Sequence, residues 1–365
     1  MHIVLSGYYG FDNVGDEAIL FSIIQSLRKL QPDIKITVLS NNPKKTSETY
    51  DVKSVGRNSI NKIIQALKKS DGLISGGGSL LQNKTGHFTI PYYLGIIKLA
   101  KLLNKPVFIY AQGMGPINGL LSELLVKTTL NKVDQITVRD EASQHLLNDI
   151  GIKQPAKIVP DPVLGLDPHD YKHNCQPINE LNQEEFITVS VRNWHTKYPF
   201  NEKLAHCLDL LVKDGYGIVF VPMHGKHDKI KSQEIAKIMQ EKSYISPADT
   251  SLQSKISLIG ESKLLIGLRL HSLIFAAINY TPFVAISYDP KIDAFASLCE
   301  QPIGGNVESD NWNGQTLYQQ VKNMLSSYKR NTDILKEKVQ VLQHQARETP
   351  ELALSVFFKR HSPSL

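Results

Sequence analysis

The chain has 365 residues, of which 41% are hydrophobic and 21% are charged, and its formal net charge is +6 at pH 7. This is an ordinary globular profile, and the length is comfortable for two domains. The positive excess is too weak and too dispersed for a nucleic-acid groove, but it fits an anionic substrate or the anionic face of a membrane.

The cysteine content and the hydropathy indicate the cellular compartment of the protein. The three cysteines are far apart and follow no pairing rule, which argues for a reducing environment and against a disulfide framework or a zinc site. The first residues show no basic region followed by a signal-type apolar core, and no run of eighteen apolar residues occurs. We therefore expect a cytoplasmic protein, with a peripheral contact at the inner face of the membrane left open.

The first half of the chain alternates between strands and helices, which predicts a parallel, doubly wound sheet. The predicted strands are His2–Ser6, Ile34–Leu39, Gly72–Ser75, Val107–Tyr110, Gln135–Val138 and Lys157–Val159. The predicted helices are Gly15–Leu30, Ile60–Lys69, Pro91–Leu103, Leu120–Asn131 and Glu141–Asp149.

A second alternating series follows a segment that is rich in proline and has little periodicity. Its predicted strands are Phe186–Arg192, Ile218–Pro222, Leu264–Ile266 and Phe283–Ser287. Its predicted helices are Asn201–Lys213, Lys229–Lys242, Leu252–Glu261, Ser272–Asn279 and Lys291–Ser297, before a polar helical tail.

These patterns predict an α/β protein with two doubly wound, Rossmann-like domains that face a cleft. The first domain covers 1–165, a linker covers 166–183, and the second domain covers 184–312. The tail, 313–365, is a candidate to pack back on the first domain.

The stretch Gly267–Ser272 lies between a predicted strand and a predicted helix, at the sheet edge where ligands bind. Its Arg269 provides a planar cation that matches a phosphate or a carboxylate, and its His271 can change protonation near neutral pH. The helix start also favours an anion. The alternative is that Arg269 pairs with a neighbouring acid and His271 caps the helix; we favour a functional site.

A glycine turn with acidic residues, Gly7–Glu17, follows the first strand. It matches neither the dinucleotide-binding nor the P-loop motif. Asp12, Asn13 and Asp16 suit hydroxyl recognition and proton abstraction. The alternative is that Asn13 and Asp16 cap the next helix.

Three further strand ends place glycines and polar groups at the same edge. Gly76, Gly77 and Gly78 permit close backbone approach to a ligand, with a tight turn as the alternative. Polar side chains at these ends could reach sugar hydroxyls. They are Ser79, Gln82, Gln112 and Arg139, the last of which has an ion pair as its alternative role.

In the second domain, Arg192 ends a strand as Arg269 does. If both arginines face one cavity, they can bind an anion that has two charged groups. Each arginine alone is more often a salt-bridge partner.

Several of these segments together resemble the polysaccharide pyruvyl transferase family, and most closely its bacterial cell-wall ketal-pyruvyl transferases. The matching segments are Gly10-x-x-Asn13-x-Gly15-Asp16-Glu17-Ala18, Gly76–Ser79, Gln112–Pro116, Val138–Asp140, Asp161–Pro162 and Arg269–Ser272.

The resemblance implies a fold like that of the GT-B glycosyltransferases, in cell-wall polysaccharide biosynthesis and S-layer anchoring. It implies phosphoenolpyruvate as donor, a lipid-linked N-acetylmannosaminyl disaccharide as acceptor, and no metal or other cofactor. By position, Arg192, Arg269, Leu270 and His271 match the donor contacts. We expect His271 to donate a proton and Asp12 or Asp16 to accept one. Motif context alone assigns acceptor binding to Asn13, Gly77, Gly78, Ser79, Gln82, Gln112 and Arg139.

Two other functions stay open. A GT-B glycosyltransferase or a sugar-nucleotide epimerase would use the same two domains with a nucleotide sugar. A sugar-binding protein without turnover would have little use for a proton donor beside a fixed cation.

Overall fold

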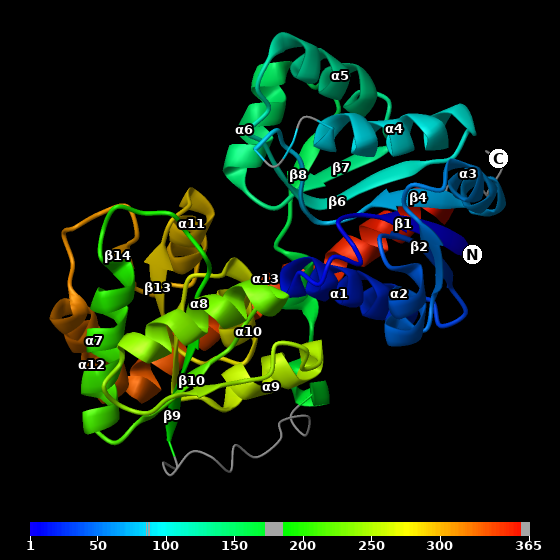
Figure 1. Ribbon diagram of the computed structural model, residues 1–365. Helices are drawn as coiled ribbons and strands as arrows, with labels where there is room; N and C mark the ends of the chain where they lie inside the picture. The colour runs from blue at the N-terminus through cyan, green and yellow to red at the C-terminus, as the bar shows by residue number, and fades with distance from the viewer. Residues whose placement is uncertain (85, 87, 172–184, 359–365) are drawn as a thin grey trace. The chain divides into compact units, whose positions relative to one another are not determined.

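The computed structural model describes residues 1–84, 86, 88–171 and 185–358, in which the chain forms two compact units (Figure 1). The first unit contains Met1–Leu166 together with the chain from Leu342 onward, and the second contains Asp167–Val341. The division falls at the start of the expected linker, of which residues 172–183 lie outside the described part. The expected tail from 313 onward is shared between the units.

The first unit is built on a parallel sheet with the strand order β3-β2-β1-β4-β6-β7-β8 and with β5 beside β6. Its strands are β1 His2–Ser6, β2 Lys35–Ser40, β3 Lys53–Gly56, β4 Gly72–Ser75, β5 Gly78–Leu81, β6 Val107–Met114, β7 Gln135–Val138 and β8 Ala156–Ile158.

Helices cover this sheet, and those that follow β3 to β7 pack an apolar core against it. They are α1 Val14–Leu30, α2 Pro43–Tyr50, α3 Ile60–Lys69, α4 Thr89–Leu102, α5 Leu120–Leu130 and α6 Glu141–Ile150. Two 3₁₀ turns, Pro162–Gly165 and Pro168–Tyr171, follow.

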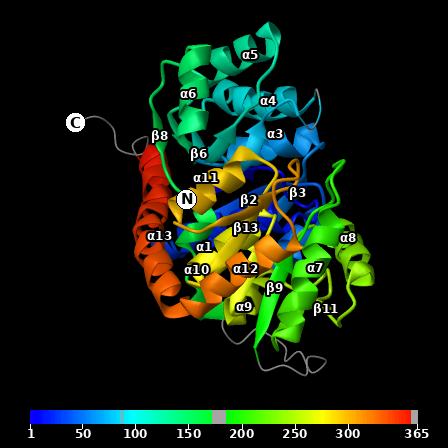
Figure 2. The ribbon, with the colours of Figure 1, turned by 90° about the vertical axis from the view of Figure 1, so that its left-hand side faces the viewer.

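The long helix α13, Tyr328–Phe358, begins in the second unit and ends in the first (Figure 2). Its Phe357 is fully buried and lies so close to Gly72 that a Cβ there would come within 2.3 Å of the ring. Its Arg347 donates a hydrogen bond from Nε to the Gly165 carbonyl at 3.2 Å. The end of α13 is therefore part of the first unit's core.

The second unit has a parallel sheet with the order β11-β10-β9-β12-β13-β14. Its strands are β9 Phe186–Ser190, β10 Gly217–Phe220, β11 Tyr244–Ile245, β12 Leu264–Gly267, β13 Phe283–Ser287 and β14 Ile303–Asn306. Its other helices are α7 Phe200–Lys213, α8 Gly225–Ile238, α9 Leu252–Glu261, α10 Leu270–Ile278, α11 Pro290–Leu298 and α12 Gly314–Ser326.

Both sheets reverse their strand order once, at β1 and β4 in the first unit and at β9 and β12 in the second. The prediction of two doubly wound, Rossmann-like domains is confirmed. In such sheets the crevice at the carboxyl ends of the strands where the order reverses is the usual ligand site. In the described part of the chain, no helix combines the length and apolar character that a transmembrane segment requires.

Candidate functional site

Arg269 lies two residues after the end of β12 and is the N-cap residue of α10. Its Nε donates to Oδ2 of Asp228 at 2.9 Å, and its Nη2 donates to Oδ1 at 2.5 Å. The Asp228 carboxylate is fully buried, and its Oδ2 also accepts a hydrogen bond from the Met223 backbone N–H at 3.2 Å. The alternative that Arg269 pairs with an acid is what the structure shows. The pair uses Nε and Nη2 of Arg269 and leaves its Nη1 outside the contact with Asp228.

The helix after Arg269 is buried except at one position. Every residue of α10 but His271 is buried, and His271 is half-buried with its Nε2 atom shielded from solvent. No side chain caps this helix, so its first-turn N–H groups and its positive dipole end are suited to an anion. Arg269, not His271, occupies the N-cap position. The capping alternative for His271 is therefore wrong.

Arg192 lies just beyond β9, which ends two residues earlier than predicted. Its guanidinium carbon is 4.4 Å from the ring centroid of Tyr288 and 5.3 Å from that of Trp194. Its Nε is buried and has no hydrogen-bond partner among the described residues. Cation–π contacts therefore hold the guanidinium group in place without using its N–H groups.

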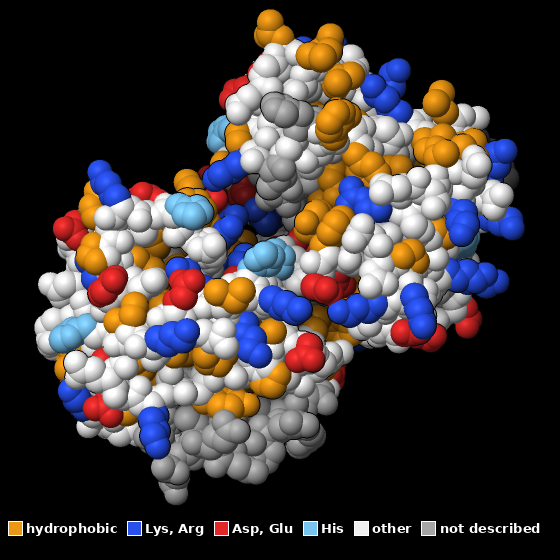
Figure 3. Space-filling view, viewed as in Figure 1, with side chains coloured by type: hydrophobic (Ala, Val, Ile, Leu, Met, Phe, Trp, Pro, Cys, Tyr) orange, Lys and Arg blue, Asp and Glu red, His pale blue; other side chains and the backbone are white. Residues whose placement is uncertain are grey.

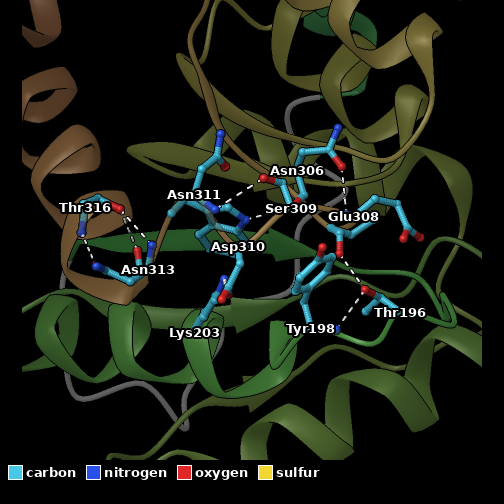
Figure 4. A network of polar contacts seen from close by, with 12 residues as sticks. Thr196, Tyr198, Lys203, Asn306, Glu308, Ser309, Asp310, Asn311, Asn313 and Thr316 are labelled. Carbon is cyan, nitrogen blue, oxygen red and sulfur yellow. Dashed lines mark hydrogen bonds and ion pairs between the residues drawn. The ribbon is translucent and has the colours of Figure 1, made fainter.

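The loop that carries Arg192 is fastened to the loop after β14. Trp194 donates a hydrogen bond from Nε1 to Oε1 of Glu308 at 2.5 Å, and Thr196 donates from Oγ1 to the Val307 carbonyl at 2.7 Å. The close-up in Figure 4 shows the polar groups of both loops turned toward each other. These contacts fix the aromatic ring that positions Arg192.

His224, at the start of α8, connects the two arginines electrostatically. Burial lowers the pKa of His224, the charge of Arg269 lowers it further, and Arg192 adds to the effect, while Asp228 opposes it. Strands β9 and β12 pair with Ser190 opposite Gly267, and each arginine lies two residues beyond its strand, so both lie at the same part of the sheet edge. We call Arg192, His224, Arg269 and His271 the cationic edge. Within the described residues, no group of three or more His, Cys, Asp or Glu is arranged to hold a metal ion.

In the first unit, Asn13 and Asp16 lie together at the β1 and β4 ends. Asn13 caps α1 by accepting from the Gly15 N–H at 3.2 Å, and its Nδ2 donates to Oδ2 of Asp16 at 2.5 Å. A Cβ on Gly78, where φ is +86°, would lie 2.9 Å from Oδ1 of Asp16. The capping alternative therefore holds for Asn13 but not for Asp16, whose carboxylate lies over the glycine run.

The glycine run separates strands β4 and β5, so the alternative of a tight turn is wrong. After Ser75 the chain continues in the same direction as β5, beside β6. A Cβ on Gly77 would come within 2.9 Å of the Ile19 side chain, so the glycine allows α1 to pack closely. Asp12 does not join this group. Its Oδ1 pairs with Lys45 Nζ at 2.6 Å, and its side chain is 67% exposed.

Arg139 and Ser79 are brought together beside this group. Arg139 donates from Nη2 to the Ser79 hydroxyl at 3.0 Å, and its Nε lies 3.5 Å from Oδ2 of Asp140. Asp140 in turn caps α6 through the Ser143 N–H at 2.7 Å. The ion-pair alternative for Arg139 is therefore present, in addition to its contact with Ser79.

The two glutamines lie deeper than predicted. Gln112 is fully buried and donates from Nε2 to the Ser75 hydroxyl at 2.8 Å, which connects β6 to β4. Gln82 is also buried, at the end of β5. A side chain enclosed in the sheet cannot reach a sugar, so the assignment of Gln112 to acceptor binding is corrected to a structural role.

Aromatic residues that the motif analysis passed over line the same edge. Tyr8 and Phe11 stack with their ring centroids 4.0 Å apart, and the guanidinium carbon of Arg57 lies 5.0 Å from the Phe11 centroid and 4.2 Å from that of Tyr92. Burial and the nearby Asp16 charge raise the pKa of Tyr8. The three aromatic residues in the turn after β1, Tyr8, Tyr9 and Phe11, were the available signal in the sequence. We call Tyr8, Phe11 and Asp16 the aromatic edge.

Comparisons with known proteins agree with this fold. The family described as polysaccharide pyruvyl transferase matches residues 13–290. The chain is 24% identical to the amylovoran biosynthesis protein AmsJ of Erwinia amylovora, over 80% of this chain and 84% of that protein. The solved structure of Anabaena HepE in complex with UDP-glucose has a TM-score of 0.65 at 13% identity, over 97% of this chain and 99% of HepE. The UDP-GlcNAc 2-epimerase of Neisseria meningitidis, bound to UDP-GlcNAc, has a TM-score of 0.65 at 11% identity, over 98% and 100%.

The Asp228–Arg269 pair predicts a large effect of a small substitution. Asp228→Asn removes the charge that compensates Arg269 while keeping the shape. We expect the free energy of unfolding to fall by about 2–3 kcal/mol, less than for a fully buried pair because Arg269 keeps some exposure. Urea unfolding measures this. The control, Asp310→Asn, breaks an exposed pair with Lys203 and should cost less than about 1 kcal/mol. Equal effects of the two substitutions would contradict the assignment.

The lowered pKa of His224 predicts a pH dependence of stability. Between the folded and the unfolded pKa of this imidazole, the unfolded chain binds more protons, so stability is lost as the pH falls below about 6.5. We expect His224→Gln to lose less unfolding free energy than the parent between about pH 7 and pH 5, measured by urea unfolding. An identical loss in both proteins would exclude His224 as the source.

Proposed function

Because the chain belongs to the polysaccharide pyruvyl transferase family, we propose that it transfers pyruvate from phosphoenolpyruvate to a sugar, which forms a ketal and releases phosphate. The observation that carries this proposal is the cationic edge, with Arg192, Arg269 and the start of α10 at one point of strand-order reversal. The proposed acceptor is the N-acetylmannosamine of a lipid-linked cell-wall disaccharide.

The charges of the donor fit this edge. Phosphoenolpyruvate has a phosphate and a carboxylate, and two guanidinium groups with a helix N-terminus supply donors for both. Arg192 is held through its π face, and we propose that its two Nη groups bind the anion. Arg269 is held by Asp228 and binds through its remaining edge, next to the backbone N–H of Leu270. The ion pair fixes the direction in which Arg269 presents that edge.

The half-buried imidazole of His271 is the proposed proton donor. Protonation of the enol methylene carbon makes it a methyl group and leaves an oxocarbenium-like centre at the neighbouring carbon. One sugar hydroxyl adds to that centre, phosphate departs, and a second hydroxyl closes the ring. The two hydroxyl groups release two protons in total. One replaces the proton that was added to the methylene carbon, and the other leaves with phosphate. The adjacent donor phosphate favours the cationic imidazole that this step requires.

The aromatic edge is the proposed acceptor side. The stacked Tyr8 and Phe11 offer a flat apolar face of the kind on which sugar rings pack. Asp16 beside them is the proposed base for the attacking hydroxyl, with Asn13 orienting its carboxylate. Asp12 is set aside for this role because Lys45 holds it on the exposed surface. Gly77, Gly78, Ser79 and Arg139 complete this edge.

The test is incubation of the purified chain with phosphoenolpyruvate and a synthetic N-acetylmannosamine-terminated lipid disaccharide. We expect acceptor-dependent phosphate release and a product with the mass of the pyruvyl ketal. Parallel incubation with UDP-sugars tests the glycosyltransferase and epimerase alternatives, which the similar folds of HepE and the Neisseria epimerase suggest. Turnover of a UDP-sugar without phosphate release from phosphoenolpyruvate would overturn the proposal.

Replacement of the proton donor separates binding from chemistry. His271→Ala should lower kcat by about 100- to 10,000-fold, because general acid help of that size is lost. Binding of phosphoenolpyruvate, measured by calorimetry, should stay within a few-fold because the arginines remain. The matched control is His145→Ala, which removes an exposed histidine of α6 and should leave kcat unchanged. Unchanged turnover in His271→Ala would exclude the acid role.

A further inference from the structure

The start of α5 exposes an unusual number of leucines. Leu120, Leu121 and Leu124 are 85%, 71% and 55% exposed, while Val126 and Leu130 of the same helix are buried. Single exposed apolar residues are ordinary, but three on one turn and a half of one helix form a patch that requires an explanation. The space-filling view in Figure 3 shows hydrophobic side chains gathered over α5.

A fourth exposed apolar residue belongs to the neighbouring helix. Phe88 is 85% exposed and is the N-cap residue of α4. Asn83, in the same loop, accepts a hydrogen bond from the Asn118 N–H at 2.7 Å and donates to the Ser122 hydroxyl at 3.2 Å. The loop that leads to α4 is therefore fastened to the start of α5. We call Phe88, Leu120, Leu121 and Leu124 the α5 patch.

The charge of this part of the chain identifies the partner. Residues 82–132, which contain α4, β6 and α5, hold six lysines and one glutamate, a net charge of +5. Lys84, Lys98 and Lys127 are exposed. Apolar side chains at the tip of a helix, together with lysines on the surrounding surface, are the features of an interfacial helix that binds anionic lipid.

We propose that the α5 patch docks this protein on an anionic phospholipid bilayer, with the leucines inserted at the level of the headgroups. The proposal rests on the proposed function, because a lipid-linked acceptor is presented at a membrane. The patch belongs to the same carboxyl edge of the first sheet as the aromatic edge, since parallel strands place the starts of their following helices on one side. Docking through α5 therefore brings the acceptor side to the bilayer.

The experiment is flotation with vesicles of phosphatidylcholine and phosphatidylglycerol, compared with phosphatidylcholine alone. We expect binding to the anionic vesicles and weaker binding at high salt. The variant with Leu120→Ser, Leu121→Ser and Leu124→Ser should bind about tenfold less, because its apolar insertion is lost. The matched control replaces three exposed residues elsewhere, Ile60, Ile230 and Leu298, each with serine, and should bind like the parent.

Two further measurements make the result decisive. Pyruvyl transfer to a water-soluble disaccharide should be equal in the parent and the triple leucine variant. A parent that transfers pyruvate but does not float overturns the docking proposal alone, and a parent that floats but transfers no pyruvate overturns the function alone. Sedimentation velocity tests the remaining alternative, in which a second copy of this chain binds the α5 patch. If the parent is a dimer that does not bind vesicles, and the triple leucine variant is a monomer, the patch is a contact between two copies. That result would overturn the proposal.

Discussion

The ion pair between Asp228 and Arg269 is the constraint on which the cationic edge depends. A fully buried carboxylate is costly unless charge and hydrogen bonds compensate it, and Arg269 with the Met223 N–H does so. Asp228 belongs to α8, which follows β10. Arg269 follows β12, and β9 lies between these two strands. The pair therefore spans the carboxyl end of the central strand and holds the start of α10, with His271, at a fixed place.

The two units use one topology to place different groups at the ends of their strands. Each sheet reverses its strand order once and collects polar residues there. In the second unit these residues are two arginines and two histidines beside two helix starts, namely Arg192, His224, Arg269 and His271. In the first unit they are carboxylate and amide groups next to stacked aromatic rings, Asp16 and Tyr8 among them. We propose one edge for a small dianion and the other for a neutral sugar, which would divide the same scaffold between a donor and an acceptor.

The features that could be predicted from the sequence are those that a local residue pattern determines. Strong periodic segments such as α3 and β13 have their predicted bounds, and the Arg269–Ser272 motif lies at a strand end as expected. The short outer strands β3, β11 and β14 were missed, because two to four residues give little alternation to recognise. Asp228 was unpredictable for another reason. It is separated from Arg269 by 41 positions in the chain, and only the strand order brings them together. Gln112 resembled a ligand contact because sequence gives no depth within a sheet.

The distribution of charge connects composition to these sites. The chain has a net charge of +6, and +5 of it belongs to residues 82–132, so the rest of the chain is close to neutral at +1. The cationic edge thus contributes little to the global excess, because acids such as Asp228 and Glu308 lie within its framework. A site for a small anion depends on the electric field of nearby groups more than on the net charge of the chain, because the ligand approaches within a few ångströms of fixed N–H groups. The excess of lysines lies around α4 and α5 instead, where an extended anionic surface responds to net charge, although Lys101 there pairs with Asp134.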